Sequence, residues 1–335
     1  MAAMTIDPNL TLQINTKSQP QQRLVAEEID GLIRVYKDGH VERPQIVPCV
    51  APSLAPELGV TCSDTIIDTY TNIWARVYVP NANQSKHHHI PLLVYFHGGG
   101  FCVGSASWIC YHEFLAKLAS KANCVVVSVN YRLAPENPLP AAYDDGVKAV
   151  NWIAHQVFVK SPQWWTSKCN VSNIFLGGDS AGANIAYNVA LRLRPSEIKG
   201  LILIQPFFGG EKRTNSEKFM VQPPRSALTV AAADAYWRLS LPAGADRDHP
   251  WCNPTVKGAG AGMRDLGILV CVSEMDILKD RNLEFCGGLK ASGCRKVEAV
   301  VFKDVGHAFQ ILNKSPVSEI RVHELICHIK SFISR

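Results

Sequence analysis

The sequence predicts an α/β fold in which a mainly parallel central sheet is covered on both faces by helices. Apolar runs of strand length alternate along the chain with segments of helical period. These runs are apolar on both faces, as expected for strands buried between two helical layers. Of the 335 residues, 47% are hydrophobic and 19% are charged, so the chain can form one large core. We therefore expect a single domain over residues 1–335.

The N-terminal part has the least regular pattern. Residues 1–22 are polar and have no sustained period, so we expect a loosely held arm. After this arm, Val25, Ile29 and Ile33 recur at helical spacing. This spacing predicts a short helix, which a turn and a strand would follow.

Strand-like and helix-like segments then alternate to the end of the chain. The predicted strands cover residues 72–80, 91–96, 124–130, 173–177, 199–204, 267–273 and 296–302. The predicted helices include residues 112–122, 141–157, 183–193, 228–241 and 323–333. The alternation breaks between Phe207 and Asn253, where proline-rich and turn-rich pieces surround the helix at 228–241. We expect residues 207–253 to be an insertion that folds over the sheet as part of a cap.

Charge and cysteine content exclude several classes of protein. The formal net charge is +5, but basic and acidic residues are interspersed, so the sequence predicts no nucleic-acid partner. The eleven cysteines form no C-x-x-C pair, which is typical of a reducing compartment. No signal-peptide pattern and no stretch of membrane-spanning length is found. We expect a cytoplasmic protein, with nuclear entry left open, and the sequence makes no prediction of oligomeric state.

The strongest local motif is Gly178-Asp179-Ser180-Ala181-Gly182, which follows a strand-like run and precedes a helix-like one. This is the setting of a nucleophile elbow, in which a tight turn holds a serine at a strained backbone angle. Side chains at Gly178 or Gly182 would collide with neighbouring backbone. The helix that begins here also directs free N–H groups toward a developing oxyanion.

A second motif, His97-Gly98-Gly99-Gly100-Phe101, ends the strand predicted at 91–96. Consecutive glycines let backbone N–H groups approach a ligand closely, which suits an oxyanion hole completed by the N–H of Ala181. A flexible turn is the alternative interpretation. A phosphate-binding loop is disfavoured because no G-K-[ST] sequence follows.

A nucleophilic serine needs a base to take its proton and an acid to orient that base. Four histidines follow the serine: His249, His307, His323 and His328. His307 is favoured because it follows a predicted strand, in a loop at the carboxyl end of the sheet. His323 and His328 lie in the predicted last helix, and His249 lies in the insertion.

Asp276 is the favoured acid because it follows the strand predicted at 267–273, at the same edge of the sheet. Asp280 is the alternative, although it is expected in the next helix. Glu274 and Asp304 are less well placed. The three favoured side chains would then follow the chain order serine, acid, histidine.

Five motifs occur together in this order: HGGGF at 97–101, YRLAPE at 131–136, GDSAGAN at 178–184, SEMDILKD at 273–280 and DVGHAF at 304–309. They resemble the plant carboxylesterases among the hormone-sensitive-lipase-like α/β-hydrolases. The resemblance extends from about Val25 to the C-terminus. It implies an α/β-hydrolase fold whose acyl pocket is capped by residues 1–50 and 207–253.

The resemblance also implies roles for individual residues. Ser180 matches the nucleophile, Asp276 the acid and His307 the base. The oxyanion hole of the family matches Gly98, Gly99, Gly100 and Ala181. His97 matches a structural position, and a supporting polar network under the elbow is expected from Arg132, Glu136 and Asp179.

Carboxylic ester hydrolysis through an acyl-enzyme is the activity that the resemblance implies. The expected substrates are small-molecule esters with short acyl chains, or esters of plant specialised metabolism, and no cofactor is needed. Two alternatives remain, namely a lyase, cyclase or dehydratase that uses the same pocket, and a small-molecule receptor. The related gibberellin receptors lack the catalytic histidine, which this sequence keeps at His307, so the receptor alternative loses support.

Two further clusters have less specific interpretations. His87-His88-His89 lacks the i,i+4 spacing and the carboxylates of a catalytic metal site, so we expect a solvated loop and no metal. Trp164, Trp165 and Trp237 either line an apolar pocket or pack in the core.

Overall fold

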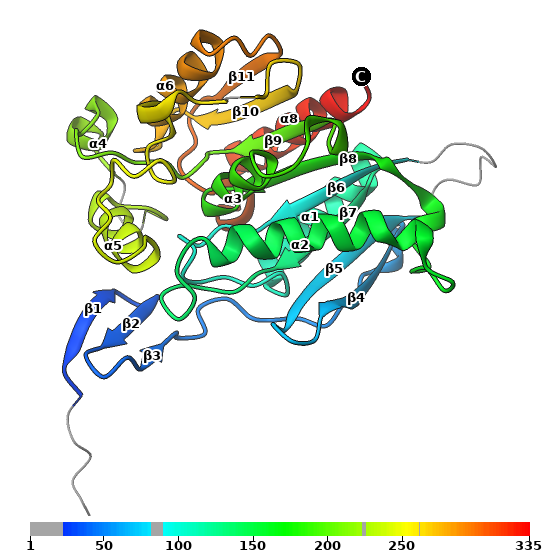
Figure 1. Ribbon diagram of the computed structural model, residues 1–335, viewed down its shortest axis with the longest axis horizontal. Coiled ribbons are helices and arrows are strands. Elements are labelled where there is room, and N and C mark those ends of the chain that lie inside the picture. Colours follow the sequence, from blue (N-terminus) through cyan, green and yellow to red (C-terminus); the bar gives the residue numbers. More distant parts are fainter. Residues whose placement is uncertain (1–22, 82–89, 223–225, 261) are drawn as a thin grey trace, which may run out of the picture.

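The computed structural model describes residues 23–81, 90–222, 226–260 and 262–335 (Figure 1). Eight strands form one sheet in the order β11-β10-β9-β8-β6-β7-β5-β4. They are β4 (Val60–Asp68), β5 (Ile73–Pro80), β6 (Ile90–Phe96), β7 (Val125–Asn130), β8 (Cys169–Asp179), β9 (Gly200–Ile204), β10 (Gly267–Ser273) and β11 (Val297–Phe302). β6 to β11 pair in parallel, whereas β5 is antiparallel to β7 and β4. The predicted α/β-hydrolase fold class is confirmed.

The helices cover the sheet on both faces. They are α1 (Ile109–Ala122), α2 (Ala141–His155), α3 (Ala181–Ala190), α4 (Asn215–Phe219), α5 (Val230–Ser240), α6 (Lys279–Ala291), α7 (Phe309–Leu312) and α8 (Pro316–Ile333). Short 3-10 turns cover Pro56–Leu58, Gln156–Phe158, Thr166–Lys168, Pro195–Glu197 and Pro254–Lys257. Buried residues of α1 and α8 form one apolar core, and those of α2, α3 and α6 belong to another.

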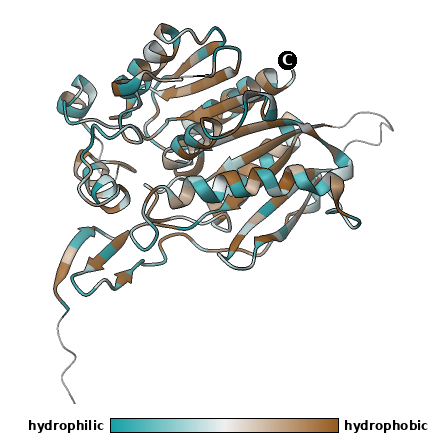
Figure 2. Ribbon diagram, in the orientation of Figure 1, coloured by the Kyte–Doolittle hydropathy of each residue, from teal (hydrophilic) through white to brown (hydrophobic). Residues whose placement is uncertain are grey.

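The central strands are hydrophobic because both of their faces are covered. Figure 2 shows brown strands in the interior and helices on which hydrophobic and hydrophilic residues alternate. In β7, for example, every residue from Val125 to Val129 is fully buried. Strand β4 was not predicted. It lies at the edge of the sheet, where polar residues interrupt its apolar ones and most of the strand is only half-buried or exposed.

The helix predicted near the N-terminus is wrong. Residues 25–42 form a three-stranded antiparallel sheet of β1 (Val25–Ile29), β2 (Ile33–Tyr36) and β3 (Val41–Glu42). Ile29 and Ile33 pair directly across a tight turn in which Gly31 has a φ of 67°. Four-residue spacing therefore marks the two sides of a hairpin here, and glycine supplies the left-handed turn that a helix would not contain.

The small sheet lies beside α5 of the insertion, at the lower left of Figure 1. Arg238 of α5 donates to both carboxylate oxygens of Glu27 in β1, at 2.8 and 3.0 Å. Residues from both segments line the pocket that contains Ser180. The N-terminal segment and the insertion, far apart in the sequence, thus meet over the carboxyl ends of the parallel strands.

Candidate active site

Ser180 occupies a tight turn between β8 and α3, with φ of 52° and ψ of −120°. The flanking glycines are required by close backbone contacts. A Cβ atom at Gly178 would lie 2.5 Å from the carbonyl carbon of Gly182, and one at Gly182 would lie 1.9 Å from the carbonyl oxygen of Phe96. Crowding from β6 thus holds the serine in a strained conformation at the tip of the turn.

The structure brings Ser180, His307 and Asp276 into one hydrogen-bonded row. His307 Nε2 lies 2.9 Å from Ser180 Oγ, and Nδ1 lies 2.7 Å from Asp276 Oδ2. A carboxylate only accepts hydrogen bonds, so Nδ1 carries the proton and Nε2 faces the serine hydroxyl as an acceptor. Asp276 is buried, and its Oδ1 accepts a hydrogen bond from the Leu278 amide at 3.0 Å. This arrangement can draw the proton from the hydroxyl as the oxygen attacks.

Electrostatics favour the protonated imidazole. Burial alone would lower the pKa of His307, but the charge and hydrogen bond of Asp276 outweigh it, with a smaller contribution from Asp179, so this pKa is raised. The imidazolium that forms when Ser180 loses its proton is therefore stabilised where it is needed.

The other candidate residues lie elsewhere. Asp280 is in α6, as expected, and accepts a hydrogen bond from the Ser216 amide. His323 and His328 are in α8, and His249 packs against Trp251 in the insertion. Glu274 accepts a hydrogen bond from the Asp304 amide at 3.2 Å.

Gly99 and Gly100 lie beside Ser180 in the same pocket. Both have positive φ angles, 111° and 58°, and neither has room for a side chain. A Cβ at Gly99 would lie 2.1 Å from the Val103 carbonyl oxygen, and one at Gly100 would lie 2.2 Å from the Tyr236 ring. Ala181 is the first residue of α3, so its amide has no intrahelical acceptor. These amides are suitable donors to an oxyanion.

Gly98 differs from the expectation. Its amide donates to Tyr111 Oη at 2.7 Å and to Asp179 Oδ1 at 3.1 Å, so it is not free to donate into the pocket. Asp179 also accepts hydrogen bonds from the hydroxyls of Tyr95 and Tyr111, at 2.8 and 3.0 Å. Burial raises the pKa of Asp179 to about 6, although these hydrogen bonds oppose the rise. Gly98 therefore anchors the glycine loop, which leaves the amides of Gly99 and Gly100 as the candidate donors of this loop.

Of the three residues expected to support the elbow, only Asp179 lies there. Arg132 pairs with Asp145 at 2.6 Å, and Glu136 pairs with Arg43 of the N-terminal segment at 2.5 Å. The prediction for Arg132 and Glu136 is wrong because both side chains find opposite charges away from the elbow. The tyrosines that replace them, Tyr95 and Tyr111, carried no local sequence signal.

The pocket above Ser180 is small and apolar. Its cavity volume is about 100 Å³. Apolar side chains come from the N-terminal segment, the insertion and α7, namely Leu32, Ile46, Val47, Leu228, Tyr236, Ile311 and Leu312. The three tryptophans considered for an apolar pocket, Trp164, Trp165 and Trp237, do not line it. Trp165 and Trp237 are buried in the core, where Trp237 stacks on Phe207 at 4.7 Å, and Trp164 is partly exposed.

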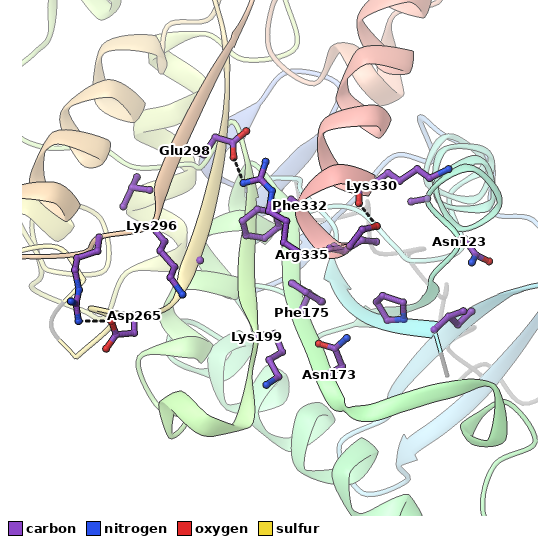
Figure 3. A pocket seen from close by; sticks show the side chains of 18 residues that line it. Asn123, Asn173, Phe175, Lys199, Asp265, Lys296, Glu298, Lys330, Phe332 and Arg335 are labelled. Carbon is purple, nitrogen blue, oxygen red and sulfur yellow. Dashed lines mark hydrogen bonds and ion pairs between the residues drawn. The ribbon is translucent and has the colours of Figure 1, made fainter. Parts of the chain in front are cut away.

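A larger hollow of about 1120 Å³ lies away from this pocket, near the amino ends of β6, β9, β10 and β11 (Figure 3). Lys199, Lys296 and Lys330 stand around it, and Arg335 pairs with Glu298 at 2.8 Å. None of the residues predicted for catalysis lines this hollow. Although this hollow is larger than the pocket at Ser180, it lacks the residues needed for the reaction.

The described part of the chain contains no group of three or more histidine, cysteine or acidic side chains placed to hold a metal ion. His87-His88-His89 lies outside the described residues. Within the described ranges, no helix has both the length and the apolarity needed to cross a bilayer.

The sheet order, the elbow and the serine–histidine–aspartate row define an α/β-hydrolase. A family model described as alpha/beta hydrolase fold matches residues 93–311, and the chain belongs to this family. The chain is 53% identical to Probable carboxylesterase 6 of Arabidopsis thaliana, over 92% of this chain and 91% of that protein. The predicted resemblance to plant carboxylesterases is thereby confirmed.

More distant relatives include both enzymes and receptors. A gibberellin receptor of Arabidopsis thaliana is 38% identical, over 73% of this chain and 69% of the receptor. Among solved structures, an esterase of Pyrobaculum calidifontis is 30% identical with a TM-score of 0.67, covering 81% of this chain and 84% of that one. Together with the carboxylesterase relatives, this likeness assigns the chain to the carboxylic ester hydrolases.

Proposed function

We propose that hydrolysis proceeds through an acyl-enzyme on Ser180. His307 takes the hydroxyl proton as Ser180 Oγ attacks the ester carbonyl, and it returns this proton to the leaving alcohol. Water then attacks the acyl-enzyme, again with His307 as the base, and the carboxylic acid leaves. Asp276 holds the imidazole in the required tautomer. The observation that carries the proposal is the row of 2.9 and 2.7 Å contacts from serine to histidine to aspartate.

The oxyanion of the tetrahedral intermediate would be held by the amides of Gly99, Gly100 and Ala181. Each such donor contributes about 2.7 to 4 kcal/mol to lowering the barrier in enzymes of this kind. Neither a metal nor an organic cofactor has a part in this scheme.

We further propose short acyl esters as the preferred substrates. A cavity of about 100 Å³ is well below the roughly 300 to 1,000 Å³ of pockets that enclose drug-sized ligands. The apolar lining favours an acyl chain of a few carbons over a polar group. Small esters of plant specialised metabolism remain compatible with this preference.

Residues 1–335 would form one domain, in which residues 1–50 and 207–253 contribute the cap of the acyl pocket. All eleven cysteines are free, which supports a cytoplasmic location. A small-molecule ester would be the partner of the site.

The test is hydrolysis of p-nitrophenyl acetate and butyrate by the purified protein and by Ser180→Ala, with mass spectrometry after paraoxon treatment. Turnover that disappears in the variant, with the probe on Ser180 of the wild type, supports the proposal. A folded wild-type protein that neither turns over nor reacts with paraoxon contradicts it. Product formation from a metabolite without labelling would then favour a lyase, and tight ligand binding without turnover would favour a receptor.

A further inference from the structure

Gln205 follows β9 directly, at the edge of the sheet where the site lies. Its φ of 47° is left-handed, a conformation that side-chain-bearing residues rarely adopt. Phe101, Ser180 and Ala308 also have positive φ angles, of 64°, 52° and 57°. Strained backbone persists where the surroundings fix it, and such residues cluster at functional sites. Gln205 belongs to this set although no motif marks it.

The buried side chain of Gln205 makes two hydrogen bonds to different parts of the site. Its Nε2 donates to Ser273 Oγ at 2.6 Å, and its Oε1 accepts from the Ala308 amide at 2.8 Å. The backbone N–H of Gln205 also donates to the backbone carbonyl of Cys271 in β10, at 2.7 Å. Gln205, Ser273 and Ala308 are all buried, where hydrogen bonds are strong and an unpaired group is costly.

These partners flank two members of the serine–histidine–aspartate row. Ala308 follows His307 directly, and Ser273 ends β10, three residues before Asp276. A single amide group therefore joins the loop that carries the histidine to the strand that carries the aspartate. The glutamine side chain supplies both the donor and the acceptor that these two bonds use.

We propose that Gln205 is a positioning residue that holds His307 between Asp276 and Ser180. The inference rests on the roles proposed for these three residues. Gln205 does not line the pocket that contains Ser180, and its side chain bonds to Ser273 and Ala308 instead of to the reacting atoms. It acts by fixing the loop on which the imidazole stands, and a displacement of about 1 Å in such a site can reduce the rate about 100-fold.

The decisive variant is Gln205→Leu, which keeps the volume and removes both hydrogen bonds. We expect kcat for p-nitrophenyl acetate to fall by about 10- to 100-fold, with little change in KM, because orientation is lost and the pocket is retained. The acid limb of the pH–rate profile should move to lower pH, since an imidazole farther from Asp276 loses the charge that raises its pKa. Ser273→Ala, a milder change, should shift both quantities in the same direction.

Gln205→Glu is the conservative variant. Its carboxylate still accepts from the Ala308 amide and can accept from the Ser273 hydroxyl, so it should retain more activity than Gln205→Leu. Its negative charge should move the acid limb to higher pH. Opposite pH shifts in the two variants are not expected from a residue that only stabilises the fold.

Gln310→Leu is the matched control. Gln310 is a buried glutamine in α7, three residues from His307, and its side-chain nitrogen and oxygen have no hydrogen-bond partner among the described residues. Its replacement should leave kcat and the pH profile unchanged. Thermal unfolding and paraoxon labelling to completion count the folded sites in every variant.

Wild-type kcat and an unmoved acid limb in folded Gln205→Leu would overturn the proposal, provided that Ser180→Ala is inactive. If Gln205→Leu does not fold, Ser273→Ala decides the question by the same two readouts. If Ser180→Ala hydrolyses esters as fast as the wild type, the proposed mechanism fails and the role of Gln205 fails with it. These outcomes separate an error about Gln205 from an error about the site.

Discussion

The guanidinium of Arg43 and the carboxylate of Glu136 form a two-point ion pair, with nitrogen–oxygen distances of 2.7 and 2.5 Å. Arg43 also donates to the carbonyl oxygens of Cys102 and Ala134, at 2.6 and 2.8 Å. Cys102 lies two residues after Gly100. One arginine thus ties the N-terminal segment to the glycine loop of the proposed oxyanion hole.

Replacing Arg43 by alanine should weaken both the fold and the pocket. Hydrogen bonds to charged groups contribute about 1.5 to 3 kcal/mol each, and partial exposure reduces this, so we expect a loss of roughly 1 to 3 kcal/mol in the free energy of unfolding. KM for p-nitrophenyl butyrate should rise because the N-terminal segment, which lines the acyl pocket, would no longer be held against the glycine loop. Urea unfolding and steady-state kinetics measure the two effects. Arg34→Ala, which breaks an exposed pair with Glu28 in the same small sheet, should change KM little.

The sequence was sufficient to predict the tight turn at Ser180 and the positions of Asp276 and His307, because each depends on features of nearby residues. Gly178 and Gly182 are dictated by contacts that no side chain can avoid. Asp276 and His307 follow strands whose carboxyl ends meet at one edge of a parallel sheet. Each of these features could be recognised within a short window of residues. The order serine, acid, histidine along the chain then limited which acid and which histidine could belong to the site.

The supporting contacts could not be predicted because they join distant residues. Arg43 reaches Glu136 across 93 residues, and Gln205 reaches Ala308 across 103. Neither partner has a pattern that depends on the other. The helix expected from Ile29 and Ile33 failed for a related reason, since the same spacing suits the two sides of a hairpin, and tertiary pairing decides between them.

The raised pKa of His307 predicts an acid limb in the pH–rate profile. The base must be neutral, so kcat/KM should rise with pH, with a midpoint above the ordinary value of 6.5. Asp276→Asn removes the charge that outweighs burial, so the limb should move to lower pH and kcat should fall by up to about 10,000-fold. Asp280→Asn is the control. An unmoved limb in Asp276→Asn would contradict the assigned pairing.

The same shift has a consequence for stability. Because the folded chain binds the His307 proton more tightly than the unfolded chain, this contribution is present below about pH 6.5 and is lost as the pH rises through the folded pKa. In a variant with His307→Gln, the pH dependence of Tm should lack this component. Calorimetry over a pH series compares the two proteins directly.

Asp179 should lower the stability of the fold when it is ionised, because its charge is buried. Its pKa is raised to about 6 by burial, so above that pH the folded protein keeps a carboxylate that accepts only from neutral hydroxyls and an amide. As the pH falls toward the ordinary value of 3.8, the folded chain takes up a proton that the unfolded chain does not, and the cost is relieved. The Tm of Asp179→Asn minus that of the wild type should therefore be more positive at about pH 8 than at about pH 4.5.

Asp145→Asn is the contrasting variant for this measurement. Asp145 is also buried, but it pairs with Arg132, so its replacement leaves a cation without its partner and should lower Tm at about pH 8.

Asp179→Asn should also reduce kcat, because the amide that replaces the carboxylate cannot accept from both tyrosines while it holds Gly98. An equal Tm difference at both pH values would contradict the raised pKa.

Leu228 tests the proposed preference for short acyl chains. It is buried in the insertion and lines the pocket of about 100 Å³. Leu228→Ala should enlarge this pocket and raise kcat/KM for p-nitrophenyl hexanoate relative to acetate, since one methylene changes discrimination by about 1 to 3 kcal/mol. Truncating a buried leucine also costs about 2 to 5 kcal/mol of stability. Leu241→Ala, at the end of α5 in the same insertion, also truncates a buried leucine but lies outside the pocket lining, so it controls for that loss. An equal change in the hexanoate-to-acetate ratio in both variants would show that Leu228 does not limit chain length.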